Sequence, residues 1–251
     1  MHDLVAISVG NSRARLATFV AGDLHEPAAY PLAQADDLVA EALARAGGSA
    51  AIAIASVNPR ASDPIFERLK RSTNVLRVGR DIPIPVTVSV DEPLVVGHDR
   101  LLNALAAFDR VKQACVVIDA GTCLTADFID GEGVFHGGVI SPGLSTMLRA
   151  MHEHAAALPL IEPAAPPRDV PFGRNTRDAM LLGAEAAIQG LAHLMIDRYA
   201  AFYEAYPQVI ATGGDAASLF EGDDLIEHIV PTLTLLGVHA AFRKFLDEPE
   251  E

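Results

Sequence analysis

Two short glycine turns carry residue types that could hold phosphate groups. One is Ser8-Val9-Gly10-Asn11-Ser12 and the other is Asp119-Ala120-Gly121-Thr122, and each lies between two strand-like segments. Glycine lets backbone N–H groups approach phosphate oxygens, and Ser or Thr hydroxyls add further donors. The two turns therefore favour a nucleotide ligand. The sequence holds neither G-x-x-x-x-G-K-[ST] nor G-x-G-x-x-G, so it does not indicate a P-loop or a Rossmann fold.

The segment Gly97-His98-Asp99-Arg100 could carry acid–base chemistry. A carboxylate can take the proton of a hydroxyl nucleophile, and the forked guanidinium of Arg100 suits a carboxylate or a phosphate. A helix is predicted over 101–112, so Asp99 also lies where aspartate is common as a helix cap. The pattern alone leaves both roles of Asp99 open.

Asp119 and Thr176 have similar alternatives. Asp119 ends a predicted strand, where its carboxylate could bind a ligand or only stabilise the turn that follows. Thr176 precedes a predicted helix over 177–205, so it could be an ordinary N-cap, contact a ligand, or do both. The apolar stripe of that helix predicts packing in the core or in a dimer interface.

The elements that must position these residues repeat along the chain. A shift of 111 residues (119 − 8) brings residues 4–11 onto 115–122, and Gly22 onto Gly133. Two unrelated β-hairpins could also look alike in this way. The repeat favours an α/β protein with two similar halves, residues 1–112 and 113–251, each a mixed sheet with flanking helices. We expect the halves to face each other across a central cleft.

Two further details of the predicted elements can be tested. A helix is expected over 62–71 with Ser62 as its cap. The segment 81–95 holds three prolines and several valines, which predicts a loop with an edge strand.

The overall composition limits the classes of partner. The formal net charge is −14 and the basic residues are not clustered, so a nucleic-acid partner is not expected. Two cysteines, Cys115 and Cys123, make no disulfide framework and fit a reduced compartment. No apolar run approaches the roughly 20 residues that span a bilayer, and the N-terminus lacks a basic signal-like region. We expect a cytoplasmic protein without a membrane partner.

Six motifs occur in the order typical of type III pantothenate kinases, and the sequence resembles that family from about residue 5 to 240. They are Ser8-Val9-Gly10-Asn11-Ser12, Gly97-His98-Asp99-Arg100, Asp119-Ala120-Gly121-Thr122, Gly137-Gly138-Val139-Ile140-Ser141-Pro142-Gly143, Gly173-Arg174-Asn175-Thr176 and Thr212-Gly213-Gly214-Asp215. The family belongs to the superfamily of sugar kinases, actin and heat-shock chaperones. The resemblance therefore implies two RNase H-like halves of the actin-like ATPase kind. It also implies ATP-dependent phosphorylation of pantothenate to 4′-phosphopantothenate, the first step of coenzyme A synthesis.

The resemblance implies a role for each candidate residue. The residues that would hold the phosphates of ATP, which binds with Mg²⁺, are Ser8, Val9, Gly10, Asn11, Ser12, Arg13, Ala14, Arg15 and Thr122. Asp99 would be the general base for the primary hydroxyl of pantothenate, and Gly97, His98 and Arg100 would contact this substrate. Asp119 would hold a monovalent cation, K⁺ or ammonium. Thr176 would reach pantothenate across the interface of a homodimer.

Ser8 departs from the family pattern, which has aspartate at this position. The exchange keeps a hydroxyl and removes a negative charge near the metal and the phosphates, whereas Asp119 retains the carboxylate in the matching turn. The loss motivates an alternative function. In that alternative, the chain is a kinase homologue that has lost turnover and acts as a regulatory or accessory factor.

Overall fold

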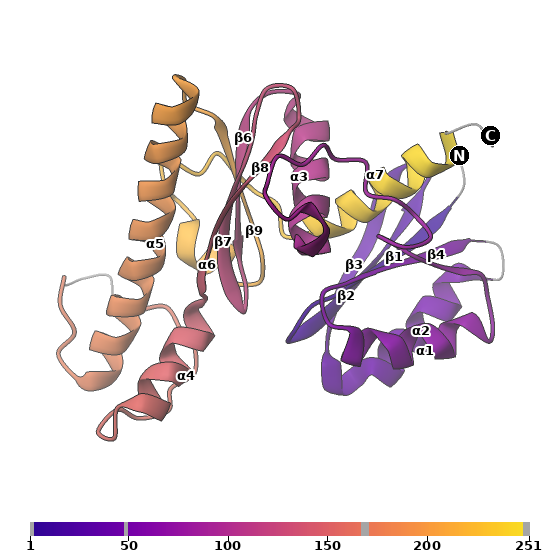
Figure 1. Ribbon diagram of the computed structural model, residues 1–251. Helices are drawn as coiled ribbons and strands as arrows, with labels where there is room; N and C mark the ends of the chain where they lie inside the picture. Colours follow the sequence, from indigo (N-terminus) through magenta and orange to yellow (C-terminus); the bar gives the residue numbers. More distant parts are fainter. Residues whose placement is uncertain (1–2, 48–49, 167–170, 248–251) are drawn as a thin grey trace. The chain divides into compact units, whose positions relative to one another are not determined.

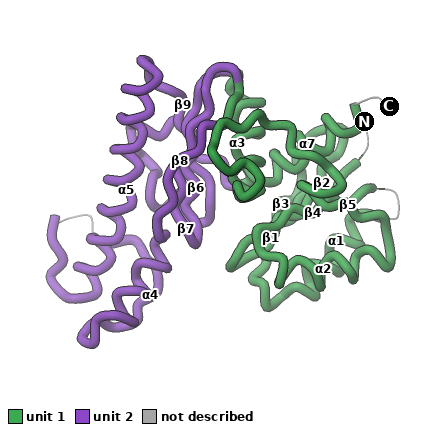
Figure 2. The backbone as a smooth tube through the Cα atoms, in the orientation of Figure 1, with its two compact units in different colours: residues 1–112, 133–135, 232–251 green, residues 113–132, 136–231 purple. Residues whose placement is uncertain are grey.

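The computed structural model describes residues 3–47, 50–166 and 171–247, which form two compact units (Figures 1 and 2). Unit 1 comprises residues 1–112, 133–135 and 232–251, and unit 2 comprises residues 113–132 and 136–231. The elements of unit 1 are β1 (Leu4–Val9), β2 (Arg13–Val20), β3 (Asp23–Pro31), η1 (Leu32–Gln34), α1 (Ala35–Ala46), β4 (Ala51–Ser56), α2 (Pro59–Lys70), β5 (Val75–Arg77), η2 (Pro93–Val95), α3 (His98–Val111) and α7 (Leu233–Asp247). Those of unit 2 are β6 (Cys115–Ala120), β7 (Cys123–Ile129), β8 (Phe135–Pro142), α4 (Leu144–His154), α5 (Thr176–Tyr203), β9 (Gln208–Thr212), α6 (Ala216–Phe220) and β10 (His228–Ile229).

Unit 1 is a five-stranded sheet with helices on both faces. The strand order is β3-β2-β1-β4-β5, with β1 antiparallel to β2 and parallel to β4. Successive side chains of β1 point to opposite faces. Val5 and Ile7 pack in a core with α1 and α2, whereas Leu4 and Ala6 pack with α3 and α7. Burial on both faces explains why β1 is an almost continuous apolar run.

Unit 2 is built on a sheet of the same topology. Its strand order is β10-β9-β6-β7-β8, with β6 antiparallel to β7 and parallel to β9. Val116 and Ile118 of β6 pack in one core with side chains of α4, α5 and α6. These helices therefore cover one face of the sheet (Figure 1).

The internal repeat predicted from the sequence is present in the fold. Read from β8, the second sheet runs β8-β7-β6-β9-β10, which matches β3-β2-β1-β4-β5 strand for strand. The strand ends correspond too, because Val57 N donates to Val9 O (3.2 Å) and Asp215 N donates to Ala120 O (3.0 Å). Val9 and Ala120 are 111 positions apart (120 − 9). The predicted α/β class with two mixed sheets and flanking helices is confirmed.

The C-terminal helix differs from the sequence-based division at residue 112. The units do change between Lys112 and Gln113, but residues 232–251 join unit 1 rather than the second half. The cause is the apolar face of α7, which packs against α3 through residues such as Leu235 and Val238. Gly237 allows this close approach, since a side chain there would collide with the carbonyl oxygen of Leu102.

The predicted N-caps of two helices are wrong by a few residues. α2 begins at Pro59 and its cap is Asn58, whose Oδ1 accepts a hydrogen bond from Ala61 N (3.2 Å), whereas Ser62 is buried inside the helix. Proline is favoured in the first turn because its missing N–H is not needed there. α5 begins at Thr176 and is capped by Asn175, so Thr176 is not the N-cap.

The edge strand expected within 81–95 is not present among the described residues. This segment makes isolated β-bridges instead, from Ile82 to Val78 and from Val88 to Phe135. Its three prolines cannot donate backbone hydrogen bonds, which prevents a continuous ladder. The segment thus remains an irregular connection into α3.

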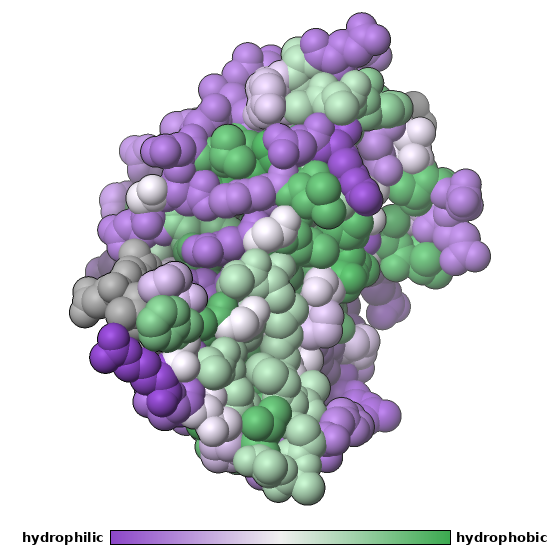
Figure 3. All heavy atoms as spheres, turned by 90° about the vertical axis from the view of Figure 1, so that its left-hand side faces the viewer, coloured by the Kyte–Doolittle hydropathy of each residue, from purple (hydrophilic) through white to green (hydrophobic). Residues whose placement is uncertain are grey.

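Helix α5 is an exception to the expectation that no apolar run is long enough for a membrane span. It has 28 residues, and an 18-residue window within it has a mean hydropathy of 1.4. Its inner face, with Leu181 and Ile188, packs in the core of unit 2, as core helices of soluble proteins also do. The outer face is exposed and carries mainly small or apolar residues: Ala179, Gly183, Ala186, Ala187, Gly190 and Leu194. Figure 3 shows a largely apolar strip on this side of the molecule.

Candidate active site

The first glycine turn connects β1 and β2 in unit 1. Gly10 N donates to Arg13 O (3.0 Å) and closes the turn. Ser8 is half-buried at the end of β1, directly opposite Arg15 on β2 and Ala55 on β4. Asn11, Ser12 and Arg13 are exposed, whereas the side chains of Val9 and Ala14 are buried. Val9 and Ala14 can therefore offer a ligand only backbone groups.

Asp99 lies in the first turn of α3, and the N-cap position is taken by Gly97. The Oδ1 atom of Asp99 accepts a hydrogen bond from Arg100 N (2.8 Å). A Cβ at Gly97 would lie only 2.6 Å from Asp99 Oδ1, so glycine makes room for this carboxylate. Burial raises the pKa of Asp99, and the Arg100 N–H and the charges of Arg100 and His98 oppose that rise more weakly. Asp99 is thus more basic than an ordinary aspartate, which suits a proton acceptor.

His98 packs against a glycine turn that sequence analysis did not identify. Its imidazole ring lies directly against Gly79, where any side chain would collide with the ring. Gly79 has φ +86°, in the region that favours glycine, and its N–H donates to Ile82 O (2.7 Å). The turn around Gly79 therefore sets the position of His98. The only signal in the sequence was a glycine two residues before the segment 81–95.

The two candidate regions of unit 1 meet through the residue that follows β4. Val57 N donates to the carbonyl of Val9 at the first glycine turn (3.2 Å). A Cβ on Gly97 would lie 3.9 Å from Cγ1 of the same Val57. The structure thus brings the start of α3 beside the first turn, although they are almost 90 residues apart (97 − 10). Arg100 also lies over the ring of the buried Phe135, with its guanidinium carbon 5.5 Å from the centroid.

The second glycine turn, in unit 2, is held on two sides by backbone contacts. Gly143 N donates to Thr122 O (3.0 Å), and Asp215 N donates to Ala120 O (3.0 Å). Gly143 and Gly213 come so close that a side chain on either would collide with carbonyl groups of this turn. Two motifs that had no assigned role, G-G-x-I-x-P-G and T-G-G-D, therefore support the turn that contains Thr122.

Asp119 lies among oxygen-bearing neighbours. The strand register places Thr125 of β7 on one side of it and Thr212 of β9 on the other. Directly opposed residues share one face of a sheet. A carboxylate flanked by two hydroxyl groups is the hard oxygen donor set that K⁺ or another hard cation prefers. Among the described residues, no group of three or more His, Cys, Asp or Glu side chains forms a metal cluster.

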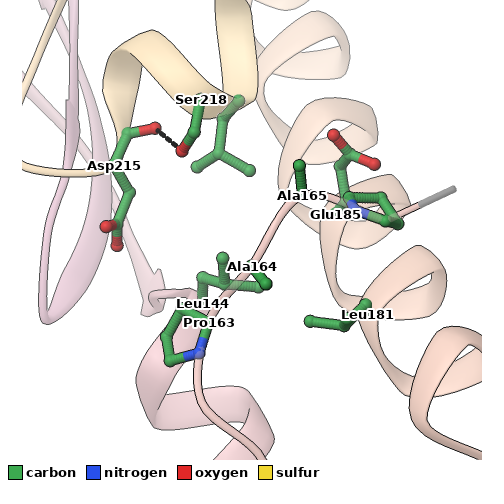
Figure 4. A pocket seen from close by; sticks show the side chains of 10 residues that line it. Leu144, Pro163, Ala164, Ala165, Leu181, Glu185, Asp215 and Ser218 are labelled. Atoms are coloured by element: carbon green, nitrogen blue, oxygen red, sulfur yellow. Dashed lines mark hydrogen bonds between the residues drawn. The ribbon is translucent and has the colours of Figure 1, made fainter. Parts of the chain in front are cut away.

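A pocket of about 140 Å³ lies beside the T-G-G-D turn within unit 2 (Figure 4). Its lining residues are Leu144, Pro163, Ala164, Ala165, Pro166, Leu181, Glu185, Asp215, Ser218 and Leu219. Figure 4 shows Asp215 and Ser218 on one side and Glu185 and Leu181 of α5 on the other. Seven of the ten lining residues are Leu, Pro or Ala, and the other three supply two carboxylates and one hydroxyl. Glu185 and Ser218 belong to no motif, so sequence analysis did not identify them.

Thr176 belongs to unit 2 and is exposed as the first residue of α5. Asn175 next to it makes two hydrogen bonds to Asp178, one from Asp178 N to Asn175 Oδ1 (2.9 Å) and one from Asn175 Nδ2 to Asp178 Oδ2 (2.7 Å). With the capping role taken by Asn175, the side chain of Thr176 is not needed as a cap and is exposed at the helix start. A ligand or a partner can therefore reach it.

Comparison with known proteins identifies clear relatives. The family model described as type III pantothenate kinase matches residues 4–198. A type III pantothenate kinase of Akkermansia muciniphila is 35% identical over 191 residues, 76% of this chain and 77% of that protein. The corresponding protein of Caulobacter vibrioides is 36% identical over 197 residues, 77% of this chain and 75% of its own length. That of Frankia alni is 31% identical over 255 residues, 96% of this chain and 99% of its own length.

Solved structures with low sequence identity share the fold. A conserved protein described as a Baf family transcriptional activator from Campylobacter jejuni superposes with a TM-score of 0.62 at 20% identity, covering 97% of this chain and 100% of that one. An archaeal actin homolog superposes with a TM-score of 0.52 at 13% identity, covering 96% and 99% of the two chains. The fold is therefore that of the actin-like ATPases, as expected.

Proposed function

The chain belongs to the type III pantothenate kinase family, and on this basis we propose that it transfers the γ-phosphoryl group of ATP to the primary hydroxyl of pantothenate. The product is 4′-phosphopantothenate, and the reaction is the first step of coenzyme A biosynthesis. The observation that carries this proposal is the family match over residues 4–198, which include every candidate site residue from Ser8 to Thr176.

Asp99 is the general base of the proposed reaction. Its carboxylate takes the proton of the primary hydroxyl while the hydroxyl oxygen attacks the γ-phosphorus. The new O–P bond forms as the bond between the γ-phosphorus and the β–γ bridging oxygen breaks, and ADP leaves. Gly97, His98 and Arg100 bind pantothenate beside Asp99. The raised pKa of Asp99 supports this role, because a stronger base takes up the hydroxyl proton more readily.

Residues 8–15 and Thr122 hold the phosphates of ATP. Phosphoryl transfer depends mainly on positioning and on stabilising charge, so rigid backbone turns are suitable supports. Mg²⁺ bound with the nucleotide would supply positive charge that neutralises the phosphates, and it would need few protein ligands because the phosphates supply the rest. The hydroxyl oxygen of Ser8 and the carboxylate oxygens of Asp119 could serve as these few protein ligands. Asp119, between Thr125 and Thr212, holds the monovalent cation, K⁺ or ammonium.

The pocket beside Asp215 takes the nucleoside of ATP. Its apolar walls, including Leu144 and Leu181, suit a base, and the carboxylates of Glu185 and Asp215 can accept hydrogen bonds from ribose hydroxyls or an exocyclic amino group. Its position next to the turn that contains Thr122 supports this assignment, because Asp215 N donates a hydrogen bond to Ala120 O. One ligand can therefore extend from the pocket to the second turn.

The active enzyme is a homodimer in this proposal, and Thr176 contacts the pantothenate bound to the partner subunit. The exposed outer face of α5 supports the dimer, because small residues such as Gly183 and Gly190 allow another helix to approach closely. The proposed partners are pantothenate, ATP and a second copy of the chain, without nucleic acid or membrane. The proposed location is the cytoplasm, which suits the free thiols of Cys115 and Cys123.

A coupled assay for phosphopantothenate with purified protein, ATP and Mg²⁺ tests the function. We expect ATP-dependent product formation that is stimulated when K⁺ or ammonium replaces Na⁺. A matched reaction with an unrelated alcohol in place of pantothenate controls for ATP hydrolysis. Failure to form phosphopantothenate with any of the three cations would refute the proposal.

Mixing two inactive variants tests the shared site. Asp99→Asn and Thr176→Ala chains, each inactive alone, are expected to regain activity when they form mixed dimers. In such a dimer one site has both Asp99 and Thr176 and the other has neither. Random pairing makes half of the dimers mixed, with one of two sites intact, so about a quarter of wild-type activity should return.

Differently tagged chains, co-expressed and purified through both tags, give the mixed dimer directly. The control is a doubly tagged dimer in which both chains carry Asp99→Asn. If doubly tagged Asp99→Asn/Thr176→Ala dimers are as inactive as this control, Thr176 does not act across the interface.

A further inference from the structure

The carbonyl oxygen of Thr122 accepts two hydrogen bonds from the start of α4. One comes from Gly143 N (3.0 Å) and the other from the hydroxyl Oγ1 of Thr146 (2.6 Å). Thr146 lies 24 residues from Thr122 and is half-buried in the first turn of α4. The bond from Thr146 is the shorter of the two and comes from a side chain, so a substitution can remove it without altering the backbone.

The internal repeat provides a comparison for this contact. With the 111-residue shift, Gly143 corresponds to Leu32 (143 − 111) and Thr146 corresponds to Ala35 (146 − 111). In the first half, Leu32 N donates to Ser12 O (3.4 Å), one residue beyond Asn11, the position that corresponds to Thr122 (122 − 111). The backbone bond therefore has a near counterpart, whereas Ala35 has no hydroxyl and cannot make the bond that Thr146 makes. The hydroxyl of Thr146 is thus an addition found at the second turn, where Thr122 is proposed to hold ATP.

We propose that Thr146 is a positioning residue for ATP, whose hydroxyl holds the Thr122 carbonyl and so orients the second phosphate-binding turn. This inference rests on the proposed function. A carbonyl with two donors on one side cannot rotate without breaking both bonds. The backbone at Thr122, from which the side chain extends, therefore keeps its position before the nucleotide arrives, and the enzyme need not order this backbone during binding.

The hydrogen bond from Asp215 to the same turn limits the expected effect of losing the Thr146 hydroxyl to Thr122. Asp215 N holds the carbonyl of Ala120 from the opposite side, so the turn as a whole stays folded without Thr146. Removing the Thr146 hydroxyl should therefore loosen Thr122 alone. The expected effect is on ATP and not on pantothenate, whose proposed contacts are Gly97–Arg100 at the start of α3 and Thr176 at the start of α5.

The test compares Thr146→Val, which keeps the shape and removes the hydroxyl, with Thr146→Ser, which keeps the hydroxyl. For Thr146→Val we expect the KM for ATP to rise about three- to tenfold, the range typical of one lost hydrogen bond, with the KM for pantothenate unchanged. Thr146→Ser should return the KM for ATP to within about twofold of wild type. Ser145→Ala, which removes a neighbouring hydroxyl from the same helical turn, is the matched control and should behave as wild type.

Calorimetric titration of each variant with the non-hydrolysable analogue AMP-PNP and Mg²⁺ provides a readout that does not need turnover. An active wild type with an unchanged KM for ATP in Thr146→Val would overturn the inference and leave the proposed function intact. Equal loss in both Thr146 variants, with a lowered melting temperature, would show a structural role only. A wild type without turnover would count against the proposed function, and equal AMP-PNP affinities of wild type and Thr146→Val would then overturn the inference as well.

Discussion

Asp99→Asn is expected to lower kcat by about 10²- to 10⁴-fold, the usual contribution of a positioned general base. Asparagine has nearly the same shape and its Oδ1 can still accept the hydrogen bond from Arg100 N. It cannot take the proton of the pantothenate hydroxyl. Substrate binding should change little, since Gly97, His98 and Arg100 remain. Steady-state kinetics with both substrates varied will separate the loss in kcat from any change in KM.

The pH dependence of the wild type follows from the direction of the Asp99 pKa. A general base must be deprotonated, so kcat/KM should fall as the pH is lowered through the pKa of Asp99. Burial raises this pKa, so the acidic limb should lie at higher pH than an ordinary aspartate would give. The limb should be absent from the residual activity of Asp99→Asn.

The stability of Asp99→Asn should move in the opposite direction from its activity. A carboxyl group whose pKa is raised by folding favours its protonated form in the folded state. Its contribution to stability is present at low pH and is lost as the pH rises through the folded pKa. Neutral asparagine avoids the cost of a buried charge at neutral pH, so the melting temperature of Asp99→Asn should equal or exceed that of wild type.

Asp91→Asn is the matched control, because Asp91 is an exposed carboxylate eight residues earlier (99 − 91). It should keep wild-type kcat and pH profile. If Asp99→Asn retains more than a tenth of the wild-type kcat with an unchanged acidic limb, Asp99 is not the base. A large loss of melting temperature in Asp99→Asn would instead indicate a structural role.

Ser8→Asp should raise kcat/KM for Mg–ATP by about tenfold, the worth of one hydrogen bond to a charged group. The substitution restores the carboxylate that the family pattern has at this position. Ser8 is half-buried at the end of β1, so a carboxylate there would reach the first turn. Arg15 lies directly opposite on β2 and can offset part of the cost of burying the new charge.

Two controls separate the charge from its position. Ser8→Asn adds the same bulk without the charge, and Ser12→Asp adds a charge at an exposed position of the same turn. Neither should gain efficiency. An active wild type that gains nothing from Ser8→Asp would contradict the prediction and show that a hydroxyl is sufficient at position 8. Turnover confined to Ser8→Asp would instead identify the natural chain as a homologue that lost turnover through this one exchange.

The sequence by itself determined the architecture and the class of chemistry. The repeat from Ser8 to Asp119 predicted two sheets of the same topology, because strands buried on both faces leave long apolar runs and the turns between them need glycine. The order of six motifs predicted the family, which the family match confirmed. The candidate roles of Asp99, Asp119 and Thr176 stay predictions until the variants are measured.

Only the tertiary structure decided which distant residues support the candidate site. In the folded protein α7 packs against α3, the ring of His98 packs against Gly79, and the hydroxyl of Thr146 donates a hydrogen bond to the carbonyl of Thr122. None of these contacts leaves a local pattern, because a glycine in a loop or a threonine in the first turn of a helix is common for many reasons. The apolar runs of the strands and the glycine turns between them depend on neighbours in sequence and can be read from it. By contrast, the hydrogen bond between Thr146 and Thr122 joins residues that are 24 positions apart. Such a contact depends on how the strands and helices pack, and this packing is set only when the whole unit folds.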